Sequence, residues 1–169
     1  MYVLIDSLKR AKHTKVEIQA VVSVQEEVGV RGAITSAFDI NPDIGIALDV
    51  TIAGDVPGVD SSDRVTSMGE GTGLGVMDSM AISDPRLVRH FRNLADAEDI
   101  KYQLDILLGG GTDAAAMQMA RAGVPVITIG PPCRYVHTVN EAAHVDDIEA
   151  SVALLTRFLD HAHDLSLEW

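Results

Sequence analysis

The chain has 169 residues, a length typical of one domain, and 47% of them are apolar while 22% are charged, the balance of an ordinary soluble globular protein. Thirteen basic residues against 25 acidic ones give a net charge of −12, and no Lys/Arg stripe is present, which argues against a nucleic-acid or anionic-membrane partner. One cysteine, Cys133, excludes an internal disulfide and is more typical of a small buried residue than of a nucleophile. Because no signal-peptide pattern and no apolar run of about 20 residues is found, we predict a cytoplasmic protein.

Short apolar runs alternate with helical patterns in the first half of the chain. We expect a helix over residues 1–12, a strand over 16–24, a helix over 29–40 and a strand over 43–52. The run "VEIQAVVSV" at 16–24 is β-branched and nearly continuous, which is typical of a strand covered on both faces. Residues 53–75 are rich in turn formers and predict a long loop ending in a short strand near Val76 and Met77.

The second half continues the alternation. Asp84 is the expected N-cap of a helix with Pro85 at its first position. After it we expect a strand over 101–108, a loop over 109–113, a helix over 114–123 closed by Gly123 and a strand over 124–130. Asp146 and Glu149 match a capping box before a last helix, whose apolar stripe is Ile148, Val152, Leu155 and Leu159.

Strands that alternate with helices predict an α/β fold: a three-layer α/β/α sandwich with helices on both faces of a mainly parallel sheet. No internal repeat or linker is visible, so residues 1–169 are predicted to form a single domain. Functional residues in such sheets lie where the strands end, at their carboxyl edge.

Polar residues stand at three predicted strand ends. Glu26 and Glu27 follow the strand at 16–24, Asp49 comes late in the strand at 43–52, and His137 follows the strand at 124–130. If these strands are parallel neighbours, the four side chains converge on one edge. Carboxylates and imidazole are the ligands expected for Zn²⁺ or a similar first-row ion.

Each of these residues also has a plain structural interpretation. Two glutamates before Gly29 usually mark a solvated turn, and His137 can belong to a surface loop. Asp49 is more unusual, because an acidic residue in a buried strand costs several kcal/mol unless it is paired or bound to a metal. The other histidines are expected to be solvated: His13, His90, His144, His161 and His163.

Two glycine-rich segments are candidates for phosphate binding. Neither "GEGTGLG" at 69–75 nor "GGGTD" at 109–113 matches a nucleotide-binding loop. The second more plausibly lets the backbone approach a site, with Thr112 or Asp113 capping the next helix.

Four segments occur in an order and spacing that resemble one family. "VVSVQEEVGVRGA", "IALDVTIAGDVPG", "LGGGTDAAA" and "RYVHTVNE" together resemble the M42 metallo-aminopeptidases, with a match from residue 1 to about residue 160. The resemblance implies a zinc-exopeptidase-like fold, two divalent metal ions (zinc or cobalt), and peptide substrates that lose their N-terminal residues. It also implies site residues: Glu26 as general base, Glu27 and His137 as ligands of one ion, Asp49 as a ligand of the other, and Gly110, Thr112, Asp113, Arg134 and Tyr135 near the substrate.

The chain departs from this family in three features. The family's H-x-D histidine, its bridging aspartate and its small inserted β-domain match nothing in this sequence, so the chain resembles the C-terminal half of a longer enzyme. We therefore expect weak, single or absent metal occupancy for the chain alone. The expected partners are further copies of the chain or a complementary N-terminal half.

Three functions remain open from the sequence. The first is a metal-dependent aminopeptidase, and the second is an inactive or complementary fragment of such an enzyme. The third is a glycosidase, which needs two carboxyl groups about 5–10 Å apart on opposite sides of a sugar. Adjacent glutamates suit that geometry poorly, and an aromatic content of 4% leaves few rings to stack on a sugar.

Overall fold

A four-stranded sheet forms the centre of the computed structural model, which describes residues 1–168. Its strands lie in the order β1 (Gly45–Leu48), β5 (Val126–Gly130), β3 (Thr72–Met77) and β4 (Tyr102–Ile106). The β1–β5 and β3–β4 pairs are parallel, and β3 and β5 join them in antiparallel fashion. A second sheet contains β2 (Thr51–Ile52), β6 (Pro132–Arg134) and β7 (Ala142–Ala143).

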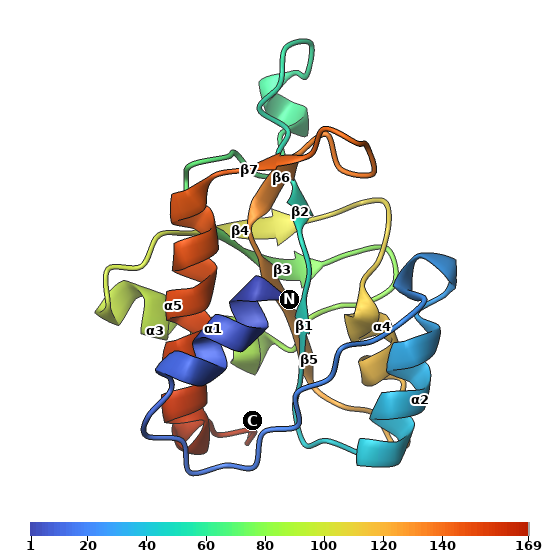
Figure 1. The fold of residues 1–169 in the computed structure, drawn as a ribbon, viewed down its shortest axis with the longest axis vertical. Helices are drawn as coiled ribbons and strands as arrows, with labels where there is room; N and C mark the ends of the chain where they lie inside the picture. Colours follow the sequence, from blue (N-terminus) through green and yellow to red (C-terminus); the bar gives the residue numbers. More distant parts are fainter. Residues whose placement is uncertain (169) are drawn as a thin grey trace.

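Helices cover both faces of the central sheet, which confirms the predicted α/β/α sandwich (Figure 1). On one face, α1 (Tyr2–Arg10) and α3 (Pro85–Ala97) pack on α5 (Val145–His161). On the other face, α2 (Arg31–Ile40) packs on α4 (Asp113–Gln118), which contacts β1 and β5. Short 3₁₀ turns lie at Glu26–Val28, Ser61–Asp63 and Ala162–Asp164. None of the described helices is both long and apolar enough to cross a membrane.

The main core lies between the sheet and the α1/α3/α5 layer. Leu74, Ile127 and Ile129 from the strands are fully buried there. The rings of Phe91 and Phe158 join them from α3 and α5 and stack on each other, with centroids 4.6 Å apart.

The predicted apolar stripe of α5 is confirmed, because Val152, Leu155 and Leu159 are buried and Ile148 is half-buried. His90 of α3, predicted to be solvated, is only half-exposed and packs edge-on against the Phe158 ring, with centroids 5.8 Å apart. Burial there lowers the pKa of His90 below its usual value.

The predicted strand over 16–24 is wrong for this chain. These residues form neither helix nor strand, and Val22 and Val24 are 60% and 66% exposed. Within the described part of the chain, no backbone N–H or C=O of residues 17–23 takes part in a hydrogen bond. The sequence pattern indicates a strand with protein packed on both faces. Among residues 1–168, no strand pairs with this segment and several of its valines are exposed.

Two other strand predictions needed correction. The predicted strand over 43–52 is two short strands in different sheets, β1 and β2, with Asp49 and Val50 at the break. The central strand β3 begins at Thr72, inside the stretch predicted to be a loop. Close packing requires a glycine in this strand, because a Cβ on Gly73 would lie 2.9 Å from the Thr51 side chain.

Helix boundaries followed the sequence only in part. Asp84 caps α3 as predicted, since its Oδ1 accepts a hydrogen bond from the Arg86 N–H at 2.8 Å. The capping box at Asp146 is wrong, because the N-cap of α5 is His144, two residues earlier, and the helix begins at Val145. Glu149 instead pairs with Arg10 of α1 at 3.0 Å. Likewise α4 ends at Gln118 and not at Gly123.

A buried carboxylate in the first turn of α5 fixes the loop that precedes β3. Asp147 is fully buried, and its oxygens accept hydrogen bonds from the N–H groups of Gly69 at 2.6 Å and Gly71 at 2.8 Å. Asp147→Ala leaves both amides without an acceptor, which we expect to cost about 3 kcal/mol of unfolding free energy. Thermal unfolding should then show a Tm about 6–12 °C lower. The control Asp146→Ala changes a neighbour whose side chain is 81% exposed and should lower the Tm little; equal effects of the two substitutions would contradict this role.

Candidate metal centre

Asp49 lies where β1 ends, beside the end of β5. Its Oδ1 accepts a hydrogen bond from the Val50 N–H at 2.8 Å. The last residue of β5, Gly130, packs so closely that a Cβ there would lie 1.5 Å from the Asp49 carbonyl oxygen. Only glycine fits beside the Asp49 backbone. Sequence reasoning missed this supporting role of Gly130, and its only signal was a glycine at the end of "VITIG".

A tight turn carries Glu26 and Glu27. The flanking residues Gln25, Gly29 and Val30 all have left-handed backbone conformations, with φ of 59°, 108° and 48°. For the β-branched Val30 such a conformation is strained, and strain of this kind persists only where the surrounding structure enforces it. The following helix closes on the turn, because the Gly32 N–H donates to the Val24 carbonyl at 2.9 Å.

His137 reaches this turn from the loop after β6. Its own backbone is left-handed, with φ of 63°, and its N–H donates to Glu141 Oε1 at 2.7 Å. The imidazole Nε2 lies 3.1 Å from Glu27 Oε1, although 110 positions separate the two residues in the sequence. Both side chains are about 70% exposed, so they meet in a region open to solvent. The structure thus brings together two of the predicted metal ligands.

Electrostatics connect these residues with Glu26, Asp49 and Asp113. Burial raises the pKa of Glu26 above its usual value, and the carboxylates of Asp49, Glu27 and Asp113 raise it further, while His137 lowers it. Burial also raises the pKa of Asp49, against the hydrogen bond from the Val50 N–H; Asp113 and Glu27 add to the rise and His137 opposes it. Four carboxylates therefore share one region with a single imidazole, an excess of negative charge that divalent cations neutralise.

The residues present fit a divalent ion only in part. Glu27 and His137 supply oxygen and nitrogen donors of the kind that zinc binds, and Asp49 supplies a further carboxylate. A catalytic zinc site ordinarily has three protein ligands. Among residues 1–168, however, no three His, Cys, Asp or Glu side chains lie close enough together to hold one ion. The chain provides part of a ligand set.

The loop before α4 and the first residue of that helix hold three of the predicted substrate-binding residues, Gly110, Thr112 and Asp113. Thr112 caps α4 through its hydroxyl, which accepts from the Ala114 N–H at 3.3 Å and also contacts the Thr128 hydroxyl at 2.9 Å. Asp113 accepts a hydrogen bond from Ser23 through Oδ2. Gly110 is exposed with φ of +86°, a conformation that glycine adopts without strain. Of these three, Asp113 is the residue whose charge raises the pKa of both Glu26 and Asp49.

The other two predicted substrate-binding residues lie at the end of β6. The Arg134 guanidinium makes a two-pronged ion pair with Asp55, through Nε at 2.8 Å and Nη2 at 2.7 Å. This guanidinium holds the pKa of the Asp55 carboxyl below its usual value, assisted by the Met68 N–H and opposed by burial. Arg134 therefore fixes the loop after β2, and Tyr135 beside it is 54% exposed. The neighbouring Cys133 is a free thiol and buried, as the sequence predicts.

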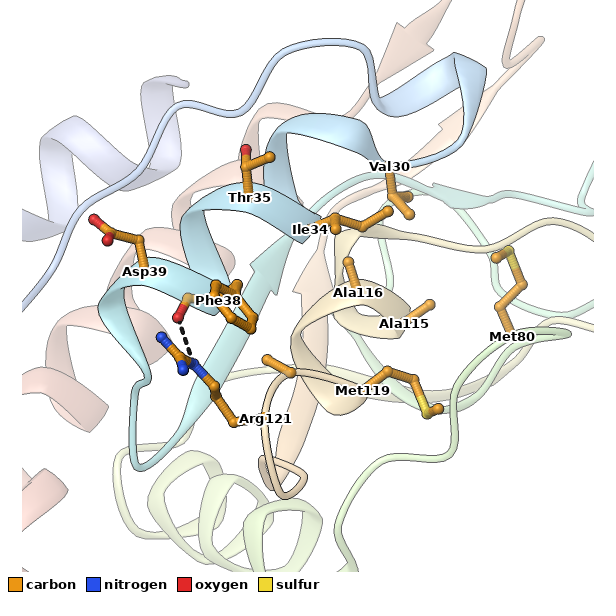
Figure 2. Close-up of a pocket in the computed structure, with 11 residues that line it drawn as sticks. Val30, Ile34, Thr35, Phe38, Asp39, Met80, Ala115, Ala116, Met119 and Arg121 are labelled. Carbon is orange, nitrogen blue, oxygen red and sulfur yellow. Dashed lines mark hydrogen bonds between the residues drawn. The ribbon is translucent and has the colours of Figure 1, made fainter.

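A large apolar groove lies elsewhere, between α2 and α4. It has a volume of about 750 Å³ and is lined by residues that include Ile34, Phe38, Met80 and Met119 (Figure 2). Its one basic side chain, Arg121, lies over the Phe38 ring and donates to the Phe38 carbonyl at 2.8 Å. None of the predicted metal ligands lines this groove, so it is separate from the candidate metal centre.

The edge strand β4 holds a buried carboxyl group at Asp105, which is 7% exposed. Burial raises its pKa and Asp78 adds to the rise, while the Thr51 hydroxyl opposes it. The folded chain thus keeps this proton to higher pH than the unfolded chain, whose aspartates titrate near about pH 3.9. The stabilisation is full below that pH and is lost as the pH rises through the folded pKa.

Asp105→Asn should remove this pH dependence. We expect the variant to be as stable as the original chain near pH 4 and more stable at pH 7. Each kcal/mol gained in unfolding free energy should raise the Tm by about 2–4 °C. Thermal unfolding at both pH values measures the difference. Asp96→Asn, at an exposed position of α3, is the control and should show no such divergence. A gain for Asp105→Asn that is the same at pH 4 and pH 7 would argue against the raised pKa.

Comparisons with known proteins give one consistent family. A family model described as M42 glutamyl aminopeptidase matches residues 1–154. A putative aminopeptidase of Acetivibrio thermocellus is 41% identical over 153 residues, which are 90% of this chain and 46% of the relative. An aminopeptidase structure from the archaeon Desulfurococcus kamchatkensis superposes with a TM-score of 0.91 at 36% identity, over 94% of this chain and 45% of that one. The Pyrococcus horikoshii TET1 peptidase, described as assembling into a tetrahedron or a large octahedral shell, gives a TM-score of 0.65 at 28% identity, over 81% of this chain and 39% of that one.

The three-layer α/β/α fold and these similarities place the chain in the class of the aminopeptidases. The chain belongs to the M42 glutamyl aminopeptidase family. It spans less than half the length of these relatives.

Proposed function

We propose that this chain carries the general base and part of the metal-ligand set of an aminopeptidase that removes residues from the amino ends of peptides. The observation that supports it most is the meeting of Glu27 and His137 at 3.1 Å, beside Glu26 on the same turn. A glycosidase is less well supported, because Glu26 and Glu27 project from one short 3₁₀ turn and cannot flank a sugar from opposite sides.

The proposed roles divide among four side chains. Glu27 and His137 would hold one divalent ion, zinc or cobalt, and Asp49 would contribute to a second. When bound, such an ion lowers the pKa of its water to about 7. Glu26 would take a proton on a carboxylate oxygen and deliver it to the departing amine. Burial, together with the neighbouring carboxylates, raises the pKa of Glu26, the direction that favours proton transfer by this side chain.

The remaining ligands would come from polypeptide outside residues 1–169. Since a catalytic zinc ordinarily has three protein ligands, each ion needs more than the chain brings together. Assembly into larger oligomers is also proposed, because the TET1 relative is described as assembling into a tetrahedron or a large octahedral shell. Asp113 and Tyr135 are proposed to face the substrate, and Gly110, Thr112 and Arg134 to shape the loops around it.

The test uses the chain co-expressed with the part of the Acetivibrio thermocellus relative that it does not match; we call this complex the completed enzyme. We expect hydrolysis of amino-acid anilides by the completed enzyme, its loss after chelation, and its return with zinc or cobalt. The chain alone should bind these ions weakly and hydrolyse nothing. Hydrolysis that persists after complete metal removal would contradict the proposal.

A further inference from the structure

A side-chain hydrogen bond joins the segment before the two glutamates to the start of α4. The Ser23 hydroxyl donates to Asp113 Oδ2, although 90 positions separate the two residues. The other oxygen of this carboxylate, Asp113 Oδ1, is buried and has no hydrogen-bond partner in the described part of the chain. Ser23 is therefore the one hydrogen-bond donor that residues 1–168 supply to the Asp113 carboxylate.

The first turn of α4 is itself fixed in the fold. Thr112, which caps the helix, contacts the Thr128 hydroxyl of β5 at 2.9 Å. The loop before the cap is held as well, because the Gly110 carbonyl accepts a hydrogen bond from the Ser79 N–H at 3.2 Å. Asp113, the first residue of α4, is thus a firm attachment point for the chain that binds it.

The turn that carries both glutamates is attached to α4 on each side. Before the turn, no backbone N–H or C=O of residues 17–23 makes a hydrogen bond within residues 1–168, so the Ser23 side chain supplies the attachment. After the turn, Val30 is buried in a cluster with Ala116, which lies one helical turn beyond Asp113 (Figure 2). Loss of the Ser23 hydroxyl would leave the turn attached on one side.

We propose that Ser23 is a positioning residue, whose hydrogen bond to Asp113 fixes the turn carrying Glu26 and Glu27 on the first turn of α4. This inference rests on the proposed function for the roles of the two glutamates. Ser23 precedes Glu26 by three residues, a span of at most about 11 Å of extended chain. The attachment also lies beside the centre, because Asp113 is close enough for its charge to raise the pKa of both Glu26 and Asp49.

Backbone amide hydrogen exchange of the chain alone tests this attachment without metal. The N–H groups of Val30 and Gly32 donate to the carbonyls of Glu26 and Val24, at 2.9 Å each. In Ser23→Ala we expect these two amides to exchange at least about tenfold faster, because the variant loses a hydrogen bond to a charged group. Exchange rates equal to those of the original chain would overturn the proposal.

Two further substitutions separate the hydroxyl from the rest of the side chain. Ser23→Thr keeps the hydroxyl, whereas Ser23→Val has nearly the same shape as the threonine variant without it. The first should keep the original exchange rates, and the second should exchange as fast as Ser23→Ala. Ser36→Ala is the control, because the Ser36 hydroxyl of α2 contacts only the Ala33 carbonyl of its own helix, at 3.3 Å. Equal rates for the threonine and valine variants would contradict a role of the hydroxyl.

A double-mutant cycle determines whether Ser23 acts through Asp113. In a chain that already carries Asp113→Ala, adding Ser23→Ala should change the two exchange rates by less than about twofold. Effects of the two substitutions that simply multiply would show that Ser23 acts by another route, and would overturn the proposal.

Activity of the completed enzyme gives the second test. Ser23→Ala should lower kcat by about 10–100-fold and leave KM nearly unchanged, because a general base displaced by about 1 Å loses efficiency while the substrate still binds. Ser23→Thr should retain kcat. An unchanged kcat for Ser23→Ala in an active completed enzyme would overturn the positioning role. Faster exchange in Ser23→Ala, together with no metal-dependent hydrolysis by the completed enzyme, would support the attachment and contradict the proposed function.

Discussion

Glu26→Gln in the completed enzyme is expected to lower kcat by about 10²–10⁴-fold, because a neutral amide cannot accept the proton that the attacking water gives up. The substitution preserves the size of the side chain and removes only its basicity. KM and metal content should stay the same, since Glu26 is not assigned to either ion. Steady-state kinetics with an amino-acid anilide, together with metal analysis of the same sample, measures all three quantities.

Glu70→Gln provides the control for this experiment. Glu70 is an exposed glutamate on the loop before β3, outside the proposed centre, and its amide variant should retain full activity. If Glu26→Gln keeps kcat within a factor of a few, or if it loses metal instead of turnover, the assignment of Glu26 as general base is wrong.

His137→Ala should weaken the binding of one ion in the completed enzyme by at least about 100-fold, a larger effect than the roughly 10–100-fold produced by residues that only hydrogen-bond to a metal ligand. Turnover should fall with it at fixed metal concentration. The physical reason is that the imidazole and the Glu27 carboxylate, 3.1 Å apart, are the only pair of predicted ligands in direct contact among the described residues. Titration with zinc, followed by calorimetry, gives the affinity.

Excess metal should restore part of the activity of His137→Ala, because the remaining ligands are intact. His13→Ala is the control, since this exposed histidine lies beside α5 in a separate groove and its loss should leave zinc affinity unchanged. An unchanged affinity in His137→Ala would remove His137 from the proposed ligand set.

The sequence predicted the architecture well because the central strands and outer helices have clear periodicity. α3 shows this best: Asp84 and Pro85 define where it begins without help from the rest of the chain. Helix ends that depend on tertiary contacts were less predictable. The buried Asp147 is bound by two glycine amides from a distant loop, and nothing in the local pattern of α5 indicates that contact.

The sequence predicted that the candidate site residues converge only if the strands that carry them are parallel neighbours. Asp49 follows β1, which pairs with β5, and His137 follows β6, which pairs with β2. The sequence does not give these pairings, so it could not show that the two residues lie near the glutamates. The close contact of Gly130 with Asp49 was missed because a glycine at a strand end does not by itself indicate which backbone packs against it.

The segment at 16–24 shows the opposite case. Its pattern correctly describes residues suited to a covered strand, but a pattern reports the environment that a segment prefers and not the polypeptide that provides it. The exposed valines of the structure and the strand-like sequence disagree because residues 1–168 do not provide the apolar surroundings that the pattern indicates.

The most direct measurement of the central claim is a crystal structure of the completed enzyme grown with zinc, with the ions located by anomalous scattering. We predict one peak within about 2.0–2.2 Å of a Glu27 carboxylate oxygen and a His137 ring nitrogen, and a second at the same distance from Asp49, with Glu26 bound to neither. Zinc found only away from these four side chains would contradict this claim.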